Sequence, residues 1–120
     1  MAVALDHMTV WTSDKLATAE FYHSIFDAHR EELRRDFAPV TVGGSLTLNL
    51  EEAETFKRGH YAFRVSEVEY GTIKERLNSA GVLFGSKSAL KDGQEYAHDG
   101  RRGVYFDDPN GHGLEVITSL

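Results

Sequence analysis

Residues 103–115, GVYFDDPNGHGLE, carry the signals that decide how the second half of the chain folds. Within them, residues 108–111 read Asp-Pro-Asn-Gly, a combination that favours a tight turn. The turn separates two apolar stretches, 101–107 and 113–118, which we expect to be strands. Glu115 is a carboxylate inside the second, otherwise apolar stretch, and a buried carboxylate needs a partner or a metal ion.

The first half of the chain begins with an alternating, β-branched and aromatic stretch over residues 3–12, which predicts a strand. Residues 13–28 change to apolar positions three and four apart, which is typical of an amphipathic helix. Shorter extended segments follow at about 30–37, about 39–43 and 45–50. This half therefore predicts one strand, one helix and three further strands.

The same order then occurs a second time. Residues 60–65 predict a strand, and Ser66 and Glu69 form a capping box that begins a helix ending near Gly81. A short strand over 82–84 and a polar loop over about 86–100 complete the segment that precedes the final two strands. We expect an α+β protein of two βαβββ modules, about 1–55 and about 56–120, within a single domain.

Length, charge and composition limit what the chain can do. It has 120 residues, a net charge of −6 and no cysteine, which excludes thiolate metal sites and disulfides. The acidic balance disfavours nucleic acid or an anionic membrane as a partner. No apolar run approaches the ~20 residues of a spanning helix. We expect a cytoplasmic protein.

Strand parity places His7, His60 and Glu115 on the faces of their strands that point away from the expected helices. His7 shares the face of its strand with Thr9 and Trp11, and His60 lies on the less apolar face of residues 60–65. Glu115 also points away from the expected helix side. Two imidazoles and one carboxylate suit Fe(II), Mn(II), Ni(II) or Zn(II) and leave positions open for substrate. Each residue taken singly is more often structural, but their joint placement favours a metal site.

These residues carry a resemblance to a known family. The segments 5–10 (LDHMTV), 59–63 (GHYAF) and 103–115 together resemble the vicinal oxygen chelate (VOC) superfamily, with its glyoxalase/bleomycin resistance/dioxygenase fold. The resemblance implies two paired βαβββ modules with a cleft lined by mixed β-sheet. It implies that His7, His60 and Glu115 are metal ligands. It further implies a homodimer with shared active sites, in which modules of two chains can swap.

Other residues are candidates for catalysis or substrate binding. By resemblance Tyr105 lines the pocket. There we expect it to donate a hydrogen bond to a metal-bound oxygen, with a cross-strand packing role as the alternative. His98 is a candidate proton shuttle, and Arg102 a candidate anion contact. We expect His112 to be exposed in its turn, and the charged cluster 30–36 to be a solvated strand edge. The resemblance adds the alternative that this strand borders the substrate pocket. The expected substrate-binding residues are Thr9, Trp11, Asn49 and Arg102.

The resemblance leaves the reaction open. Thr47 and Asn49 stand where glyoxalase I has a carboxylate ligand, which disfavours lyase chemistry of that type. Residues 41–52 contain no histidine for dioxygenase acid–base chemistry, a role that His98 would have to fill. We expect a divalent-metal-dependent enzyme, dioxygenase-like or fosfomycin-transferase-like, that binds a small oxygenated substrate and stabilises a developing oxyanion. The alternative is a small-molecule sequestering protein of the bleomycin-resistance type.

Overall fold

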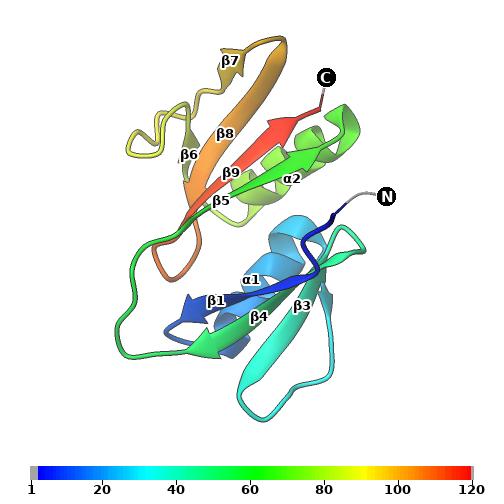
Figure 1. Cartoon of the computed structure of the whole chain (residues 1–120). Helices are drawn as coiled ribbons and strands as arrows, with labels where there is room; N and C mark the ends of the chain where they lie inside the picture. Colours follow the sequence, from blue (N-terminus) through cyan, green and yellow to red (C-terminus); the bar gives the residue numbers. More distant parts are fainter. Residues whose placement is uncertain (1–2, 120) are drawn as a thin grey trace. The chain divides into compact units, whose positions relative to one another are not determined.

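The chain divides into two compact units, with the boundary along the sequence between Lys57 and Arg58 (Figure 1). The structure is a computed structural model that describes residues 3–119; Met1, Ala2 and Leu120 lie outside the described residues. Each unit combines one helix with one mixed β-sheet. The α+β class and the two βαβββ modules expected from the sequence are confirmed.

The first unit contains a four-stranded sheet in the order β1-β4-β3-β2. Its first and last strands along the chain, β1 and β4, pair in parallel, and the other neighbours are antiparallel. The elements are β1 (His7–Thr12), α1 (Lys15–Phe26), β2 (His29–Arg30), β3 (Phe37–Val42) and β4 (Leu46–Glu52).

One face of this sheet is covered by α1. The helix begins because the Asp14 carboxylate accepts hydrogen bonds from the backbone N–H groups of Leu16 and Ala17. It ends at Asp27, whose left-handed backbone (φ 55°) stops the helix. Buried side chains of the helix, among them Tyr22, pack on β3 and β4. The opposite face of the sheet is left without a helix of its own unit.

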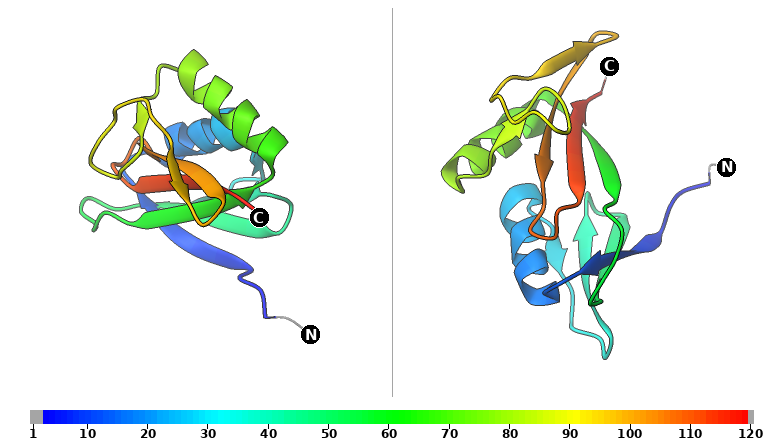
Figure 2. Two further views of the ribbon diagram at one scale, coloured as in Figure 1. Left: turned by 90° about the horizontal axis from the view of Figure 1, so that it is seen from above. Right: turned by 90° about the vertical axis from the view of Figure 1, so that its left-hand side faces the viewer.

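The second unit repeats this plan with one additional short strand. Its sheet has the order β5-β9-β8-β6, with β7 also paired to β8. Here β5 and β9 are parallel, and the other neighbours are antiparallel. The elements are β5 (His60–Val65), α2 (Glu67–Ser79), β6 (Phe84–Gly85), β7 (Tyr96–His98), β8 (Arg101–Asp107) and β9 (Gly113–Thr118). Figure 2 shows each helix lying on one face of the sheet of its own unit.

The boundaries of α2 follow from its terminal residues. The Ser66 side chain accepts from the Glu69 backbone while the Glu69 carboxylate accepts from the Ser66 backbone, which confirms the predicted capping box. At the other end Gly81 adopts φ +70°, and its N–H and that of Val82 donate back to Asn78 and Leu77. This pair of bonds is the Schellman arrangement that glycine permits.

Two segments differ from the sequence-based expectations. The strand expected over 30–37 is reduced to β2, because the polar cluster at 31–36 forms a loop instead of continuing the sheet. The loop expected over 86–100 contains the short strand β7. Among the described residues, no helix is long and apolar enough to cross a membrane.

Candidate functional site

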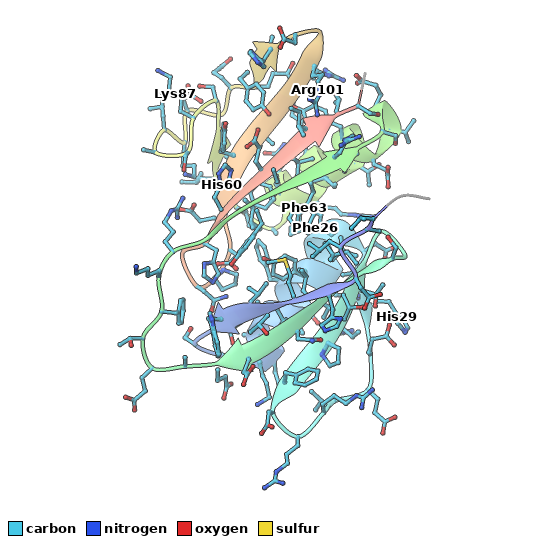
Figure 3. The ribbon with its side chains drawn as sticks, in the orientation of Figure 1. Phe26, His29, His60, Phe63, Lys87 and Arg101 are labelled. Carbon is cyan, nitrogen blue, oxygen red and sulfur yellow. The ribbon has the colours of Figure 1, made fainter. Side chains whose placement is uncertain are left out.

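His60 and Glu115 meet on the face of the second sheet that points away from α2. They come from the neighbouring strands β5 and β9, in which Ala62 lies opposite Glu115. The His60 Nε2 and Glu115 Oε1 atoms are 3.1 Å apart. The Glu115 side chain is only 13% exposed, whereas that of His60 is 57% exposed. Figure 3 labels His60 where β5 begins.

Two tyrosines surround the Glu115 carboxylate. The Tyr96 hydroxyl donates a short hydrogen bond to Glu115 Oε2. Tyr105 lies directly across from Glu115 on β8, and its ring centroid is 5.4 Å from that of Tyr96 and 6.0 Å from that of His60. Burial raises the pKa of both phenols, and the Glu115 carboxylate raises them further. Both tyrosines are therefore O–H donors at neutral pH.

The His60–Glu115 pair has the chemistry and spacing of two ligands to one divalent ion. Imidazole nitrogen and carboxylate oxygen both bind such ions at about 2.0–2.2 Å, so donors on one ion lie about 3 Å apart. The observed 3.1 Å between Nε2 and Oε1 fits that spacing. The largely buried carboxylate also matches a group that needs a cationic partner.

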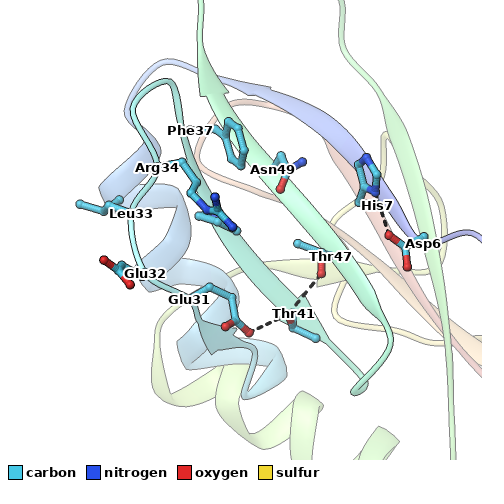
Figure 4. A pocket seen from close by; sticks show the side chains of 11 residues that line it. Asp6, His7, Glu31, Glu32, Leu33, Arg34, Phe37, Thr41, Thr47 and Asn49 are labelled. Carbon is cyan, nitrogen blue, oxygen red and sulfur yellow. Dashed lines mark hydrogen bonds and ion pairs between the residues drawn. The ribbon is translucent and has the colours of Figure 1, made fainter.

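His7 lies in the first unit, on the face of β1 that points away from α1. Its Nδ1 atom is 2.8 Å from the Asp6 carboxylate, and the imidazole borders a pocket of about 760 Å³ within this unit (Figure 4). A carboxylate that accepts from one imidazole nitrogen orients the ring and leaves the other nitrogen available. The pocket residues are Asp6, His7, Glu31, Glu32, Leu33, Arg34, Phe37, Pro39, Thr41, Thr47 and Asn49.

This pocket uses the helix-free face of the sheet and the loop after β2. The register places Asn49 opposite Pro39, and Thr47 opposite Thr41, so their side chains share one face. Thr41 donates to Glu31 at 2.9 Å, which ties the loop to the sheet. Residues 31–34 thus line the pocket from a loop, whereas the sequence predicted a solvated strand edge over the 30–36 cluster.

Three further predicted residues lie on open faces. Thr9 and Trp11 are exposed on the same face of β1 as His7, with Thr9 opposite Asn49 in the sheet. His98 is exposed at the end of β7, and its Nε2 lies 3.1 Å from the Asp99 carboxylate. None of these positions tests a catalytic or binding role.

Arg102 lies on the α2 side of β8. Its guanidinium pairs with Glu67 at 2.6 Å and lies 4.8 Å from the centre of the Tyr70 ring. Neighbouring residues on a strand point to opposite faces, so Arg102 and Tyr105 lie on opposite sides of the sheet. These contacts favour a structural role for Arg102 in attaching α2.

The expectation that His112 is exposed is wrong. The side chain is fully buried, and its Nδ1 accepts the Gly59 backbone N–H at 2.8 Å. The Asp108 carboxylate caps the turn by accepting from the His112 backbone N–H. The turn thus folds the imidazole inward, where it fixes the residue immediately before His60.

No group of three or more His, Cys, Asp or Glu side chains suited to a metal ion occurs among residues 3–119. The three ligands predicted from the sequence are divided between the units: His7 belongs to the first, and His60 and Glu115 to the second. Within the second unit, the structure places His60 and Glu115 side by side.

Tyr96 is the site residue that the sequence reasoning missed. It lies on β7, inside the stretch expected to be a loop. The signal that could have found it is the Asp99-Gly100 pair, in which both residues have positive φ (51° and 76°). An Asp-Gly pair between two short extended segments is typical of a two-residue β-hairpin.

Comparisons with known proteins identify relatives over the whole chain, although no family model matches it. The metallothiol transferase FosB of Shouchella clausii is 31% identical over 126 residues, covering 98% of this chain and 82% of that protein. The structure of an oxidase, ChaP-H2, has a TM-score of 0.90 and 34% identity, covering 100% of this chain and 96% of that chain.

A third structure shows the fold at lower identity. The glyoxylase/bleomycin resistance protein/dioxygenase domain from Frankia sp. EAN1pec has a TM-score of 0.79 at 18% identity and covers 100% of both chains. The two βαβββ units agree with this fold. The relatives named as a metallothiol transferase and as an oxidase are similar to the chain over nearly its whole length. The chain belongs to the vicinal oxygen chelate superfamily.

Proposed function

We propose that the chain is a divalent-metal-dependent enzyme that acts on a small oxygenated molecule. The observation that carries the proposal is the His60–Glu115 pair, in which a largely buried carboxylate lies 3.1 Å from an imidazole nitrogen. The name metallothiol transferase, borne by a relative that is 31% identical, supports it.

His60 and Glu115 would provide two ligands, and His7, from the first unit of the same or of a second copy, the third. This donor set takes Fe(II), Mn(II), Ni(II) or Zn(II). The chemistry that such an ion supplies when bound is Lewis-acid stabilisation of negative charge on a substrate oxygen.

The remaining residues would bind and orient the substrate. The pocket beside His7 offers the Phe37 ring as an apolar wall and the Asn49 amide as a donor and acceptor. Thr9 and Trp11, on the same face of β1, would extend the binding surface. Tyr105 would donate its hydroxyl proton in a hydrogen bond to a substrate oxygen, since burial keeps that proton in place at neutral pH. His98 would exchange protons with solvent, because it is exposed.

An oxidase-type or dioxygenase-like reaction is the version that we favour. The relative named as an oxidase is 34% identical to this chain, and its structure superposes on it with a TM-score of 0.90. The alternative is thiol transfer, the activity in the name of the relative that is 31% identical. Lyase chemistry of the glyoxalase I type is disfavoured because Thr47 and Asn49 provide no carboxylate.

Two expectations from the sequence become part of this proposal. The protein would be a homodimer with shared active sites, which sedimentation equilibrium would measure directly. It would act in the cytoplasm on a small molecule, without nucleic acid or membrane as a partner.

Metal loading followed by two assays tests the function. Fe(II)-loaded protein is assayed for oxygen uptake with a panel of phenols and quinols, and Mn(II)-loaded protein for conjugation of cysteine or glutathione to fosfomycin. Oxygen uptake that Glu115→Gln abolishes supports the oxidase-type reaction, and conjugation supports thiol transfer. The proposal would be wrong if the protein took up no metal but bound a panel compound tightly, with the same affinity in Glu115→Gln. That result would identify a sequestering protein instead.

A further inference from the structure

We propose that Tyr96 is a positioning residue that holds one oxygen of Glu115 so that the other faces His60, the second proposed metal ligand. The inference rests on the proposed function, because it assigns Glu115 as a ligand. It concerns how that ligand is oriented.

The two oxygens of Glu115 have different partners. Oε2 accepts the Tyr96 hydroxyl, whereas Oε1 lies 3.1 Å from His60 Nε2. The hydrogen bond from the phenol fixes which oxygen faces Tyr96 and which faces His60. Tyr96 would therefore restrict rotation of the Glu115 carboxylate.

The absence of a side chain at Gly103 allows Tyr96 to reach Glu115. Gly103 on β8 is the pairing partner of Tyr96 on β7. A Cβ atom built on Gly103 would lie 2.7 Å from Tyr96 Cε2 and still closer to its hydroxyl. Any side chain at position 103 would thus push the phenol away from the carboxylate. Gly103 on β8 thus provides the space that the Tyr96 ring on β7 occupies.

The phenol is well suited to this role at neutral pH. A phenol is protonated at this pH, so its O–H can donate to Glu115 Oε2. Groups that hydrogen-bond a metal ligand from behind commonly change metal affinity by about 10–100-fold when removed. We expect a loss of that size for Tyr96→Phe.

The same unit contains a matched control. The Tyr70 hydroxyl donates to the Glu95 carboxylate at 2.8 Å, on the side of the sheet that carries α2. Tyr70→Phe removes the same kind of bond away from Glu115. A loss of affinity that comes only from lost stability would appear in both variants.

Zn(II) affinity of the full chain is measured by competition with a chromophoric chelator, in the absence of substrate. Wild type, Tyr96→Phe, Gly103→Ala, Tyr70→Phe and Glu115→Gln are compared, and thermal unfolding of each metal-free protein checks its folding. We expect 10–100-fold weaker binding for Tyr96→Phe, a similar loss for Gly103→Ala, and a change below about twofold for Tyr70→Phe. Gly103→Ala tests the inference even if Tyr96→Phe fails to fold, because it keeps the tyrosine.

Two results overturn the inference alone: Zn(II) affinity of Tyr96→Phe within twofold of wild type, or an equal loss in Tyr70→Phe. Failure of the proposed function looks different. In that case wild type takes up no Zn(II), or Glu115→Gln binds it as tightly as wild type, and both proposals fall together.

Discussion

Replacing the buried His112 should weaken the second unit through one specific hydrogen bond. Its Nδ1 accepts the Gly59 N–H at 2.8 Å, and the Gly59 carbonyl accepts the Gly113 N–H at 2.9 Å. The imidazole thereby fixes the start of β5 beside β9. His112→Leu keeps a side chain of similar size but leaves the Gly59 N–H without its acceptor.

The expected cost follows from that unpaired donor. An unsatisfied, partly buried N–H destabilises a protein by about 1–3 kcal/mol. With a urea m-value of about 2 kcal/mol per M, the unfolding midpoint should fall by about 0.5–1.5 M at unchanged m. His112→Asn is the matched variant, because its side chain oxygen can take the place of Nδ1.

Urea unfolding followed by circular dichroism measures both variants against wild type. We expect His112→Leu to lose the full amount and His112→Asn to lose clearly less. An unchanged midpoint in His112→Leu, or equal losses in the two variants, would refute the assignment of the bond as the source of stability.

The remaining predictions concern α2. Ser66→Ala should cost about 0.5–2 kcal/mol in urea unfolding, because the Glu69 N–H loses its cap; a loss below 0.3 kcal/mol would contradict the capping role. The Ser66 backbone N–H lowers the pKa of Glu69, so its stabilisation is present above the unfolded-state pKa and disappears as pH falls through the lower folded-state pKa. The stability difference between wild type and Glu69→Ala should therefore shrink in acid, and a constant difference between pH 7 and pH 3 would be inconsistent with this linkage. Gly81→Ala should destabilise by about 1–2 kcal/mol, because φ is +70° and no atom lies near the new methyl group. Gly71→Ala, in the middle of α2 and equally unobstructed, should instead stabilise by about 0.5–1 kcal/mol, and the same sign for both glycines would refute the backbone argument.

Features that depend on neighbours along the chain could be predicted from the sequence. The period of the apolar residues located both helices, and the Ser66–Glu69 pair located the start of α2 within one residue. Strand parity placed His7, His60 and Glu115 on the sheet faces without helices. The alternation of more and less buried residues along β1, β5 and β9 agrees with that placement. These features need only local geometry.

Features that depend on distant contacts could not be predicted in the same way. His112 lies in a turn, where no periodicity indicates which side chains point inward, and its burial depends on Gly59 more than fifty residues earlier. The strand β7 has three residues, too few to show alternation, and its stability comes from pairing with β8. Tyr96 was missed for this reason, although the hairpin residues Asp99-Gly100 signal it.

Anomalous diffraction from crystals of the metal-loaded protein shows whether His60 and Glu115 bind a metal ion, because it locates the ion and identifies the element. We expect one strong peak at about 2.0–2.2 Å from both His60 Nε2 and Glu115 Oε1, with His7 as a third ligand. Crystals soaked in the same metal that show no peak at the His60–Glu115 pair, or a peak only at other residues, would contradict it.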